Sequence, residues 1–247
     1  MTSQEKQFLN FCIDFKKELV PYETNLEKVR IGEDGDGGYV ICDIPSIKYD
    51  ALYSYGSDDN ITFEKSFYEK YKVDSFVYDH TINGITNKPD YINFFKQGVG
   101  PVPSIDLDTV NNHIQNNSHT RCKNLIMQMD IEGHEWGVLN SADLSQFAQI
   151  IIEYHMPTHA FSDMIDIIKK VNKSFTCVHI HGNNCLLQPW FDHNLPRCFE
   201  VSYVRNDLIS KKVKMTGSFP CKLDTPNDHK RPDLTLDWWH HDSEYYK

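Results

Sequence analysis

The stretch NLIMQMDIEGHEW, residues 124–136, places carboxylates directly after an apolar run. Residues 124–130 have the composition of a buried strand, and Asp130 and Glu132 stand at its end. Buried carboxylates are costly unless they have partners. The stretch therefore indicates a functional edge of a sheet, although Glu132 and Glu135 would also suit a structural role at the start of a helix.

Four other predicted strands also end in polar side chains. The strand at 51–56 ends at Gly56 and is followed by Ser57, Asp58 and Asp59, and the strand at 73–79 ends at Asp79 and is followed by His80 and Thr81. The strand at 148–155 ends with Glu153 and His155. The strand at 175–182 contains His179 and His181 and is followed by Asn183 and Asn184. Turns favour Gly, Pro, Asn and Asp rather than Glu or His. Each residue alone has a structural explanation, such as a helix cap for Asp79. Together they predict one ligand site, because ligands bind beyond the carboxyl ends of parallel strands.

The elements that position these residues alternate between strands and helices. Strands are predicted at 51–56, 73–79, 124–130, 148–155, 175–182 and 199–204, and helices at 3–19, 62–71, 106–115, 135–144 and 161–174. This alternation is typical of βαβ units and predicts an α/β fold with a doubly wound, mostly parallel sheet and helices on both faces. A hairpin or strand–loop–strand is predicted at 28–44.

The bulk composition narrows the class of protein. The chain has 247 residues, of which 40% are hydrophobic, and this is enough for one large domain. A net charge of −10 and no long basic run argue against a nucleic-acid partner. No apolar stretch is long enough to span a membrane, and no secretory leader is recognisable. Seven scattered cysteines suit free thiols in a reducing compartment, so a cytoplasmic location is expected.

The order of two residues suggests a nucleotide-type ligand. Gly56 follows the first strand of the series and Asp79 ends the second, the order in which dinucleotide folds use a glycine turn and a ribose-binding acid. The phosphate-binding glycines are missing, and Asp58, Asp59 and Glu64 stand in their place. Such a loop repels phosphate and favours a cation. S-adenosylmethionine carries ribose, a sulfonium and an ammonium group, and it fits this pattern.

The ordered motifs resemble those of the FkbM-type methyltransferases. They are VRIGEDGDGGYVICD, LYSYGSDDNITFE, FVYDHT, MDIEGHEW, IIIEYH and VHIHGNN, and they span roughly residues 28–205. The resemblance implies a Rossmann-like class I fold and S-adenosylmethionine-dependent O-methyl transfer. Three segments are expected: an N-terminal helical segment at 1–27, a methyltransferase domain at 28–216, and a Pro- and Asp-rich C-terminal tail packed on that domain at 217–247.

The resemblance also implies which residues bind the cofactor. Gly56 matches the glycine of the first cofactor loop, Asp79 the ribose-binding acid, and Gln97 with Gly98 the adenine side. The remaining expected cofactor contacts are Ser57, Asp58, Glu64, His80, Asp130 and Gly38. Gly38 belongs to DGDGG, residues 34–38, which is expected to compensate for a missing second glycine in the first loop.

Catalysis of hydroxyl methylation needs a base or a metal ion, because a hydroxyl is a weak nucleophile near neutral pH. The expected catalytic residues are Asp130, Glu153, His155 and His181. One alternative uses His155 or His181 as the base. The other uses Asp130, Glu153 and His181 as ligands of Mg²⁺ or another divalent cation. The sequence leaves both open.

The expected acceptor is a small molecule or glycan. Aromatic side chains available for stacking on a sugar are Tyr154, Trp190, Phe191, Trp238 and Trp239. A metal-dependent hydrolase is an alternative, although no established zinc motif is present. It would use the H-x-H of His179 and His181, the D-x-E of Asp130 and Glu132, and the E-x-H of Glu153 and His155. A second alternative is an inactive binding module on the same fold.

Overall fold

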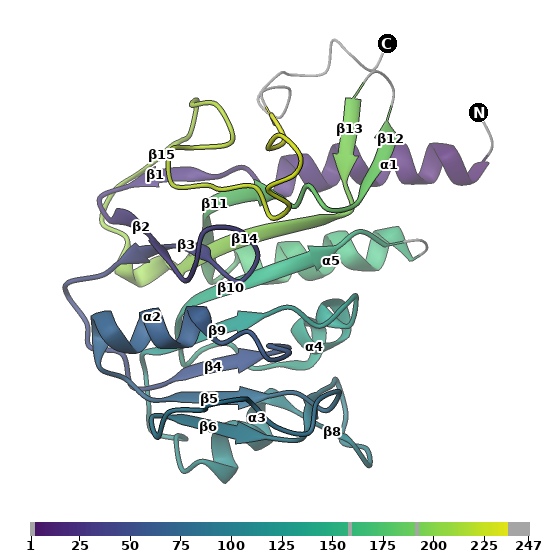
Figure 1. The fold of residues 1–247 in the computed structure, drawn as a ribbon. Coiled ribbons are helices and arrows are strands. Elements are labelled where there is room, and N and C mark those ends of the chain that lie inside the picture. Colours follow the sequence, from purple (N-terminus) through teal and green to yellow (C-terminus); the bar gives the residue numbers. More distant parts are fainter. Residues whose placement is uncertain (1–2, 158–159, 191–192, 237–247) are drawn as a thin grey trace.

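A seven-stranded sheet forms the centre of the computed structural model, which describes residues 3–157, 160–190 and 193–236 (Figure 1). The strand order is β11-β14-β10-β9-β4-β5-β6. The bounds are β4 (Leu52–Tyr55), β5 (Ser75–Tyr78), β6 (Ile92–Phe95), β9 (Leu125–Met129), β10 (Phe147–His155), β11 (Phe175–Gly182) and β14 (Cys198–Arg205). Within this sheet only β14 runs antiparallel to its neighbours. The predicted doubly wound, mostly parallel sheet of a Rossmann-like fold is confirmed.

The order of the strands reverses at β4. From β4 the chain continues to β5 and β6 on one side, and later returns to β9 and β10 on the other. In such sheets the ligand crevice opens where the order reverses, beyond the carboxyl ends of the strands. β4, β5, β9, β10 and β11 all run in the same direction, so the five polar strand ends lie along one edge, as predicted.

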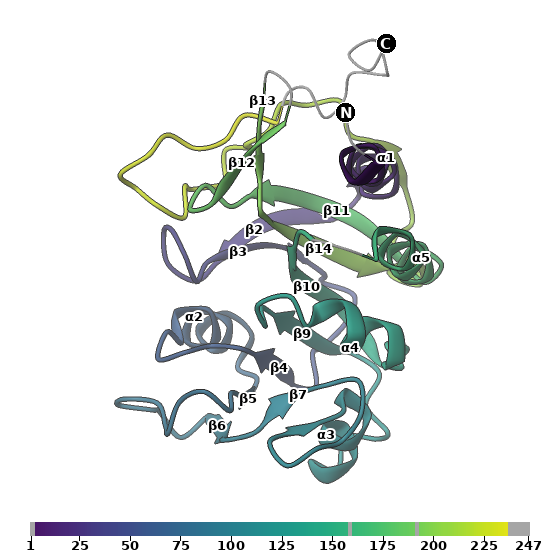
Figure 2. The same ribbon diagram turned by 90° about the vertical axis from the view of Figure 1, so that its right-hand side faces the viewer.

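Helices cover both faces of the sheet, but unequally (Figures 1 and 2). The helices are α1 (Ser3–Glu18), α2 (Thr62–Tyr71), α3 (Val110–Asn116), α4 (Glu135–Ser141) and α5 (Phe161–Asn172). The main core joins one face to α1, α3, α4 and α5. On the other face, α2 shares its core with the hairpin of β2 (Glu27–Ile31) and β3 (Tyr39–Asp43), which sequence analysis predicted as a hairpin.

Local patterns explain the central elements. β9 is buried along its whole length, because it lies in the middle of a sheet covered on both faces, and its sequence is accordingly a continuous apolar run. α5 buries Ile165, Ile168 and Val171, whose spacing places them on one side of the helix. α1 contributes Phe11 and Phe15 to the main core.

The remaining elements are short. They are β1 (Tyr22–Thr24) paired with β15 (Lys212–Lys214), β7 (Gly98–Val99) with β8 (Leu107–Asp108), β12 (Leu187–Trp190) with β13 (His193–Pro196), and the 3-10 helix Asn206–Leu208. All seven cysteines belong to the described part of the chain and are free. Among the described helices, none combines the length and apolarity needed to cross a membrane.

Candidate active site

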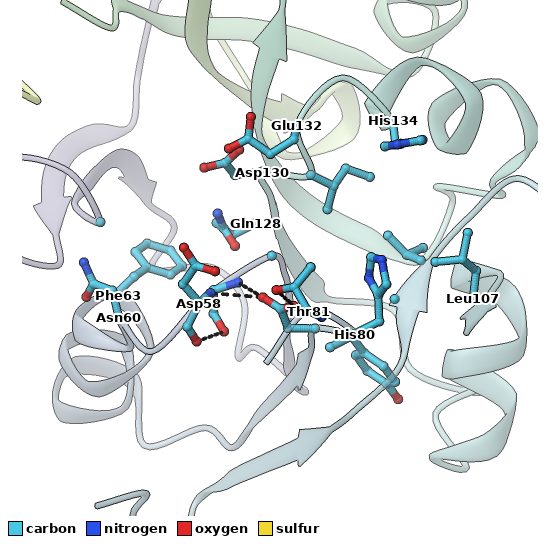
Figure 3. A pocket seen from close by; sticks show the side chains of 18 of the residues that line it. Asp58, Asn60, Phe63, His80, Thr81, Leu107, Gln128, Asp130, Glu132 and His134 are labelled. Carbon is cyan, nitrogen blue, oxygen red and sulfur yellow. Dashed lines mark hydrogen bonds between the residues drawn. The ribbon is translucent and has the colours of Figure 1, made fainter. Parts of the chain in front are cut away.

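A cavity of about 570 Å³ opens at the carboxyl edge of the sheet, where the strand order reverses (Figure 3). Its volume is in the range of small-molecule and cofactor sites. The structure brings most of the predicted cofactor residues to its walls. These are Gly56, Ser57, Asp58, Glu64, Asp79, His80, Gly98 and Asp130.

At Gly56 the chain that leaves β4 lies directly against the chain that leaves β9. Its φ of +76° lies in the left-handed region, and a Cβ at this position would stand 1.8 Å from the carbonyl oxygen of Asp130. The Asp130 N–H donates to the Tyr55 carbonyl at 2.9 Å, so the two chain segments are held together at this point. Only glycine fits this position without moving Asp130.

Gly56→Ala is therefore expected to destabilise the fold and displace Asp130. The left-handed conformation alone costs a non-glycine residue about 1–3 kcal/mol, and relief of the backbone contact adds to this. The measurement is the free energy of unfolding in urea. Gly84→Ala is the matched control, because a Cβ there meets nothing within 4 Å. An equal and small loss in both variants would contradict the close approach.

Asp79 holds the loop that follows β4. One carboxylate oxygen accepts from the backbone N–H groups of Ser57 and Asp58 at 3.2 and 3.0 Å, and the other accepts from the N–H and hydroxyl of Thr81 at 2.8 and 2.6 Å. Burial tends to raise the pKa of Asp79, but the hydrogen bonds from Thr81, Asp58 and Ser57 outweigh it and lower the pKa. All four lone-pair positions are used. A ribose hydroxyl would therefore have to replace one of these donors.

Glu64 presents an unpaired carboxylate oxygen at the pocket. The residue is 2% exposed, and its Oε1 accepts a 2.5 Å hydrogen bond from Ser54. Its Oε2 is buried and has no partner. Burial raises the pKa of this carboxyl, against the opposing effect of the Ser54 hydrogen bond. A buried polar atom left unpaired is costly, so this oxygen indicates a ligand that donates to it.

The lining of the cavity is strongly acidic. Its acids are Asp36, Asp58, Glu64, Asp79, Asp106, Asp130 and Glu132, and none of the described lining residues is Lys or Arg. A concave surface lined by one sign of charge concentrates ligands of the opposite sign. The cavity therefore favours a cationic ligand and disfavours phosphates, as the acids after the first strand predict.

Asp130 and Glu132 lie next to each other on one wall of the cavity (Figure 3). Burial raises the pKa of Asp130 to about 7; the charge of His155 opposes this shift, and Glu132 and Glu135 add to it. A carboxyl with a pKa near neutrality is suited to exchange protons with a substrate. Perturbed acids in a cleft are typical of catalytic sites.

His155 lies behind Asp130 and is not among the lining residues. Its Nε2 lies 3.2 Å from Glu132 and 3.9 Å from Asp130, and its Nδ1 lies 3.1 Å from the buried Glu135. Burial tends to lower the pKa of His155, but hydrogen bonds to Cys198 and Glu135 raise it to about 12. A protonated ring balances the surrounding acids, and this geometry favours that role over the predicted role of general base.

Glu153 and His181 are not brought to the cavity. In the register of the sheet, Glu200 on β14 pairs with Glu153 on one side and with His181 on the other. Two strand spacings separate the backbones of Glu153 and His181 by about 10 Å. Both His181 nitrogens contact carboxylates, Nδ1 with Glu200 at 3.1 Å and Nε2 with Asp233 at 3.0 Å.

The predicted metal set of Asp130, Glu153 and His181 is therefore not assembled among the described residues. The groups whose ligand atoms lie within 4.8 Å of one another are Asp130–Glu132–His155, Glu153–His155–Cys198 and His179–Cys221–Asp224. His179 and His181 of the H-x-H motif have separate carboxylate partners, Asp224 and the Glu200–Asp233 pair. The motif does not act as a two-histidine metal ligand here.

Other predicted residues lie beside the cavity. Gln97 contacts the ring of His113 at 3.3 Å, while its neighbour Gly98 lines the wall. Gly38 is likewise outside, but Asp36 and Gly37 of the same loop line the cavity. Tyr154 is fully buried and is not available for stacking on a sugar. Of the other predicted stacking residues, Phe191, Trp238 and Trp239 lie outside the described residues, and the side chain of Trp190 is also not described.

Several lining residues were not predicted. They include Tyr39, Asn60, Phe63, Ser104, Leu107, Gln128 and His134. Asp36 and Gly37 also line the cavity, and they belong to the DGDGG run that the sequence indicates as a whole. Gln128 was a weaker signal, because it is the one polar residue within the apolar run of β9. The segment around Ser104 gave no recognisable pattern.

Part of the chain is similar in sequence to a known protein family. Residues 98–175 match the sequence model of the methyltransferase FkbM domain. No curated protein matches the chain. Among solved structures, the chain is similar to a predicted O-methyltransferase, protein Atu636 from Agrobacterium tumefaciens, with 9% identity, a TM-score of 0.34, and coverage of 66% of this chain and 77% of that one. The similarity to the methyltransferase FkbM domain therefore covers about a third of the chain, from residue 98 to residue 175.

Proposed function

We propose that this chain is an S-adenosylmethionine-dependent O-methyltransferase that acts on a hydroxyl of a sugar, a glycan or a related small molecule. The observation that carries the proposal is the unpaired, buried Oε2 of Glu64 in an acidic cavity at the point where the strand order reverses. The family match supports the reaction class, and the cavity supports the choice of a cationic cofactor.

The cavity residues fit S-adenosylmethionine. Glu64 would accept from its ammonium group, because among the described residues that line the cavity it is the one with a buried carboxylate oxygen that lacks a donor. His80, Val99 and Leu107 provide a less polar wall suited to the adenine. Asp79 would hold the 57–58 loop against the ribose. When bound, the cofactor supplies an electrophilic methyl group.

Asp130 would activate the acceptor hydroxyl. In its ionised form it accepts the hydroxyl proton, and the adjacent His155 cation stabilises that form. Glu132, whose side chain is 85% exposed, stands at the mouth and is available to the hydroxyls of an incoming sugar. The enzyme otherwise acts by positioning the acceptor for in-line attack.

A divalent ion could assist at the same place. Asp130, Glu132 and His155 form a group of two carboxylates and one imidazole, which suits Mg²⁺ or a similar hard or borderline ion. An ion there would have to displace the proton held by His155. We therefore propose that Asp130 acts as the base without an obligatory metal, and that metal assistance is the alternative.

Calorimetric titration with S-adenosylmethionine and S-adenosylhomocysteine tests the proposal. We expect both to bind in EDTA, and a sugar panel incubated with the first to yield a product heavier by one methyl group. Absence of binding with and without Mg²⁺ would overturn the cofactor assignment. Binding without transfer to any acceptor would favour an inactive module, and activity restored only by Mg²⁺ would favour the metal alternative.

A further inference from the structure

Three side chains of types that bind metal ions join β11 to the segment that follows β15. Figure 1 shows this segment in yellow-green, next to β11. His179 comes from β11, and Cys221 and Asp224 come from the segment after β15. One ligand atom from each lies within 4.8 Å of the other two. The side chains of His179 and Asp224 are 3% and 1% exposed. Imidazole, thiolate and carboxylate are the protein ligands of Zn²⁺.

A single turn presents the thiol and the carboxylate together. The N–H of Asp224 donates to the carbonyl of Cys221 at 3.1 Å, and the N–H of Cys221 donates to Oδ2 of Asp224 at 2.7 Å. The N–H of Leu223 donates to the Cys221 sulfur at 3.4 Å. Burial and the nearby Asp224 charge raise the pKa of the Cys221 thiol to about 11, against the smaller opposing effect of the Leu223 N–H, so a metal ion would bind with loss of the thiol proton. The other oxygen of Asp224 lies 2.8 Å from Nε2 of His179.

The polar atoms of this group are incompletely paired. Nδ1 of His179 is buried without a hydrogen-bond partner. The buried Asp224 carboxylate lies 2.8 Å from Nε2 of His179. The charge of His181 also reaches Asp224, but His181 already contacts Glu200 and Asp233. A buried carboxylate needs a compensating charge, which a metal ion would supply.

The geometry needs only a small adjustment to hold an ion. Zinc bonds of about 2.0–2.3 Å place tetrahedral ligand atoms about 3.3–3.8 Å apart. No pair of the three ligand atoms is farther apart than 4.8 Å, and the Nε2–Oδ1 pair is at 2.8 Å. Movements of this size are within the reach of side-chain rotation. A water molecule would complete the fourth position.

We infer that His179, Cys221 and Asp224 bind Zn²⁺ or a similar borderline divalent ion. The ion would attach the C-terminal segment to the sheet. The same segment contacts the cavity wall, because Asn227 donates to Glu200 at 2.7 Å and to Asp36 at 3.5 Å. The ion would therefore have a structural role, because it would hold in place a segment that also contacts the cavity wall.

Metal content tests the inference. The full chain, purified without chelator and dialysed into metal-free buffer, should retain about one zinc per chain by mass spectrometry. His155→Gln is the first control, because His155 belongs to both other candidate metal groups. This variant should keep its zinc, whereas Cys221→Ser should lose it. Failure of the wild type to bind added Zn²⁺, or loss of zinc only in His155→Gln, would overturn the inference.

Cobalt substitution identifies the sulfur ligand. Co²⁺ bound to the wild type should show a thiolate charge-transfer band in the near ultraviolet. Cys198→Ser should keep the band and Cys221→Ser should lose it, since these two cysteines belong to different groups. Chelation should also lower the melting temperature of the wild type. If Cys221→Ser does not fold, the wild-type protein alone still tests the site. The site would be refuted if Co²⁺ gave no thiolate band and chelation left the melting temperature unchanged.

Discussion

Asp130→Asn is expected to lower the rate of methyl transfer by about 10²–10⁴-fold, the usual contribution of a general base. Asparagine keeps the shape of the side chain but accepts no proton. The backbone contacts of Asp130 with Tyr55 are unchanged by this substitution, so the fold should remain. The measurement is kcat with saturating S-adenosylmethionine, together with the affinity for S-adenosylhomocysteine, which should change little.

The pH dependence separates a base from a structural role. The Asp130 carboxyl has a raised pKa of about 7, and its ionised form is the active one. The wild-type rate should therefore rise as pH increases and level off at or above this value. A bound cationic cofactor would favour the carboxylate and move the midpoint lower. Asp130→Asn should lose this rise.

Glu132→Gln is the matched control for Asp130→Asn. It removes a neighbouring charge whose side chain is 85% exposed, and it should leave a pH-dependent rate with a lower midpoint, since Glu132 helps to raise the pKa of Asp130. If Asp130→Asn kept its activity, or if only Glu132→Gln lost it, Asp130 would not be the base.

Glu64→Gln is expected to weaken S-adenosylmethionine binding by about 10- to 150-fold, equivalent to the about 1.5–3 kcal/mol of a hydrogen bond to a charged group. The substitution removes the charge that would meet the ammonium group and retains the shape. S-adenosylhomocysteine should be weakened equally, because it also carries the ammonium. The measurement is calorimetric titration of both ligands.

The melting temperature of the free protein tests the role of Glu64 independently of cofactor binding. In the free protein Glu64 is 2% exposed and one oxygen is unpaired, so a neutral amide should leave the melting temperature unchanged or higher. Asp106→Asn is the matched control, since Asp106 also lines the cavity but is exposed. Equal losses of affinity in the two variants would assign the effect to the general acidity of the cavity rather than to Glu64.

Much of the fold could be predicted because local sequence patterns determine its strands and helices. Buried parallel strands are continuous apolar runs, and the run ending at Met129 is one of them. The hairpin at β2 and β3 follows from two apolar segments around a Gly/Asp cluster. The short pair β7–β8 was not predicted, because two-residue strands have no periodicity to recognise.

Several cavity residues could also be predicted from the sequence. Gly56, Asp79 and Asp130 follow central strands directly, Glu64 lies in the first turn of α2, and the strand order places them at one cavity. The loop acids predicted a cation because charge is a property of the residues themselves. The individual roles were not predictable: the carboxylate of Asp79 is used by backbone donors, which only the loop conformation shows.

The sequence by itself determined an α/β sheet with polar residues at one edge and an acidic ligand site, since both follow from residue type and short-range spacing. The tertiary structure decided which polar ends meet. β14 is the last strand of the sheet in sequence, yet it inserts between β10 and β11 and separates His181 from Glu153. Pairing between distant segments depends on packing of the whole core, so His181 bonds Asp233 of the C-terminal segment while Asp130 reaches the cavity.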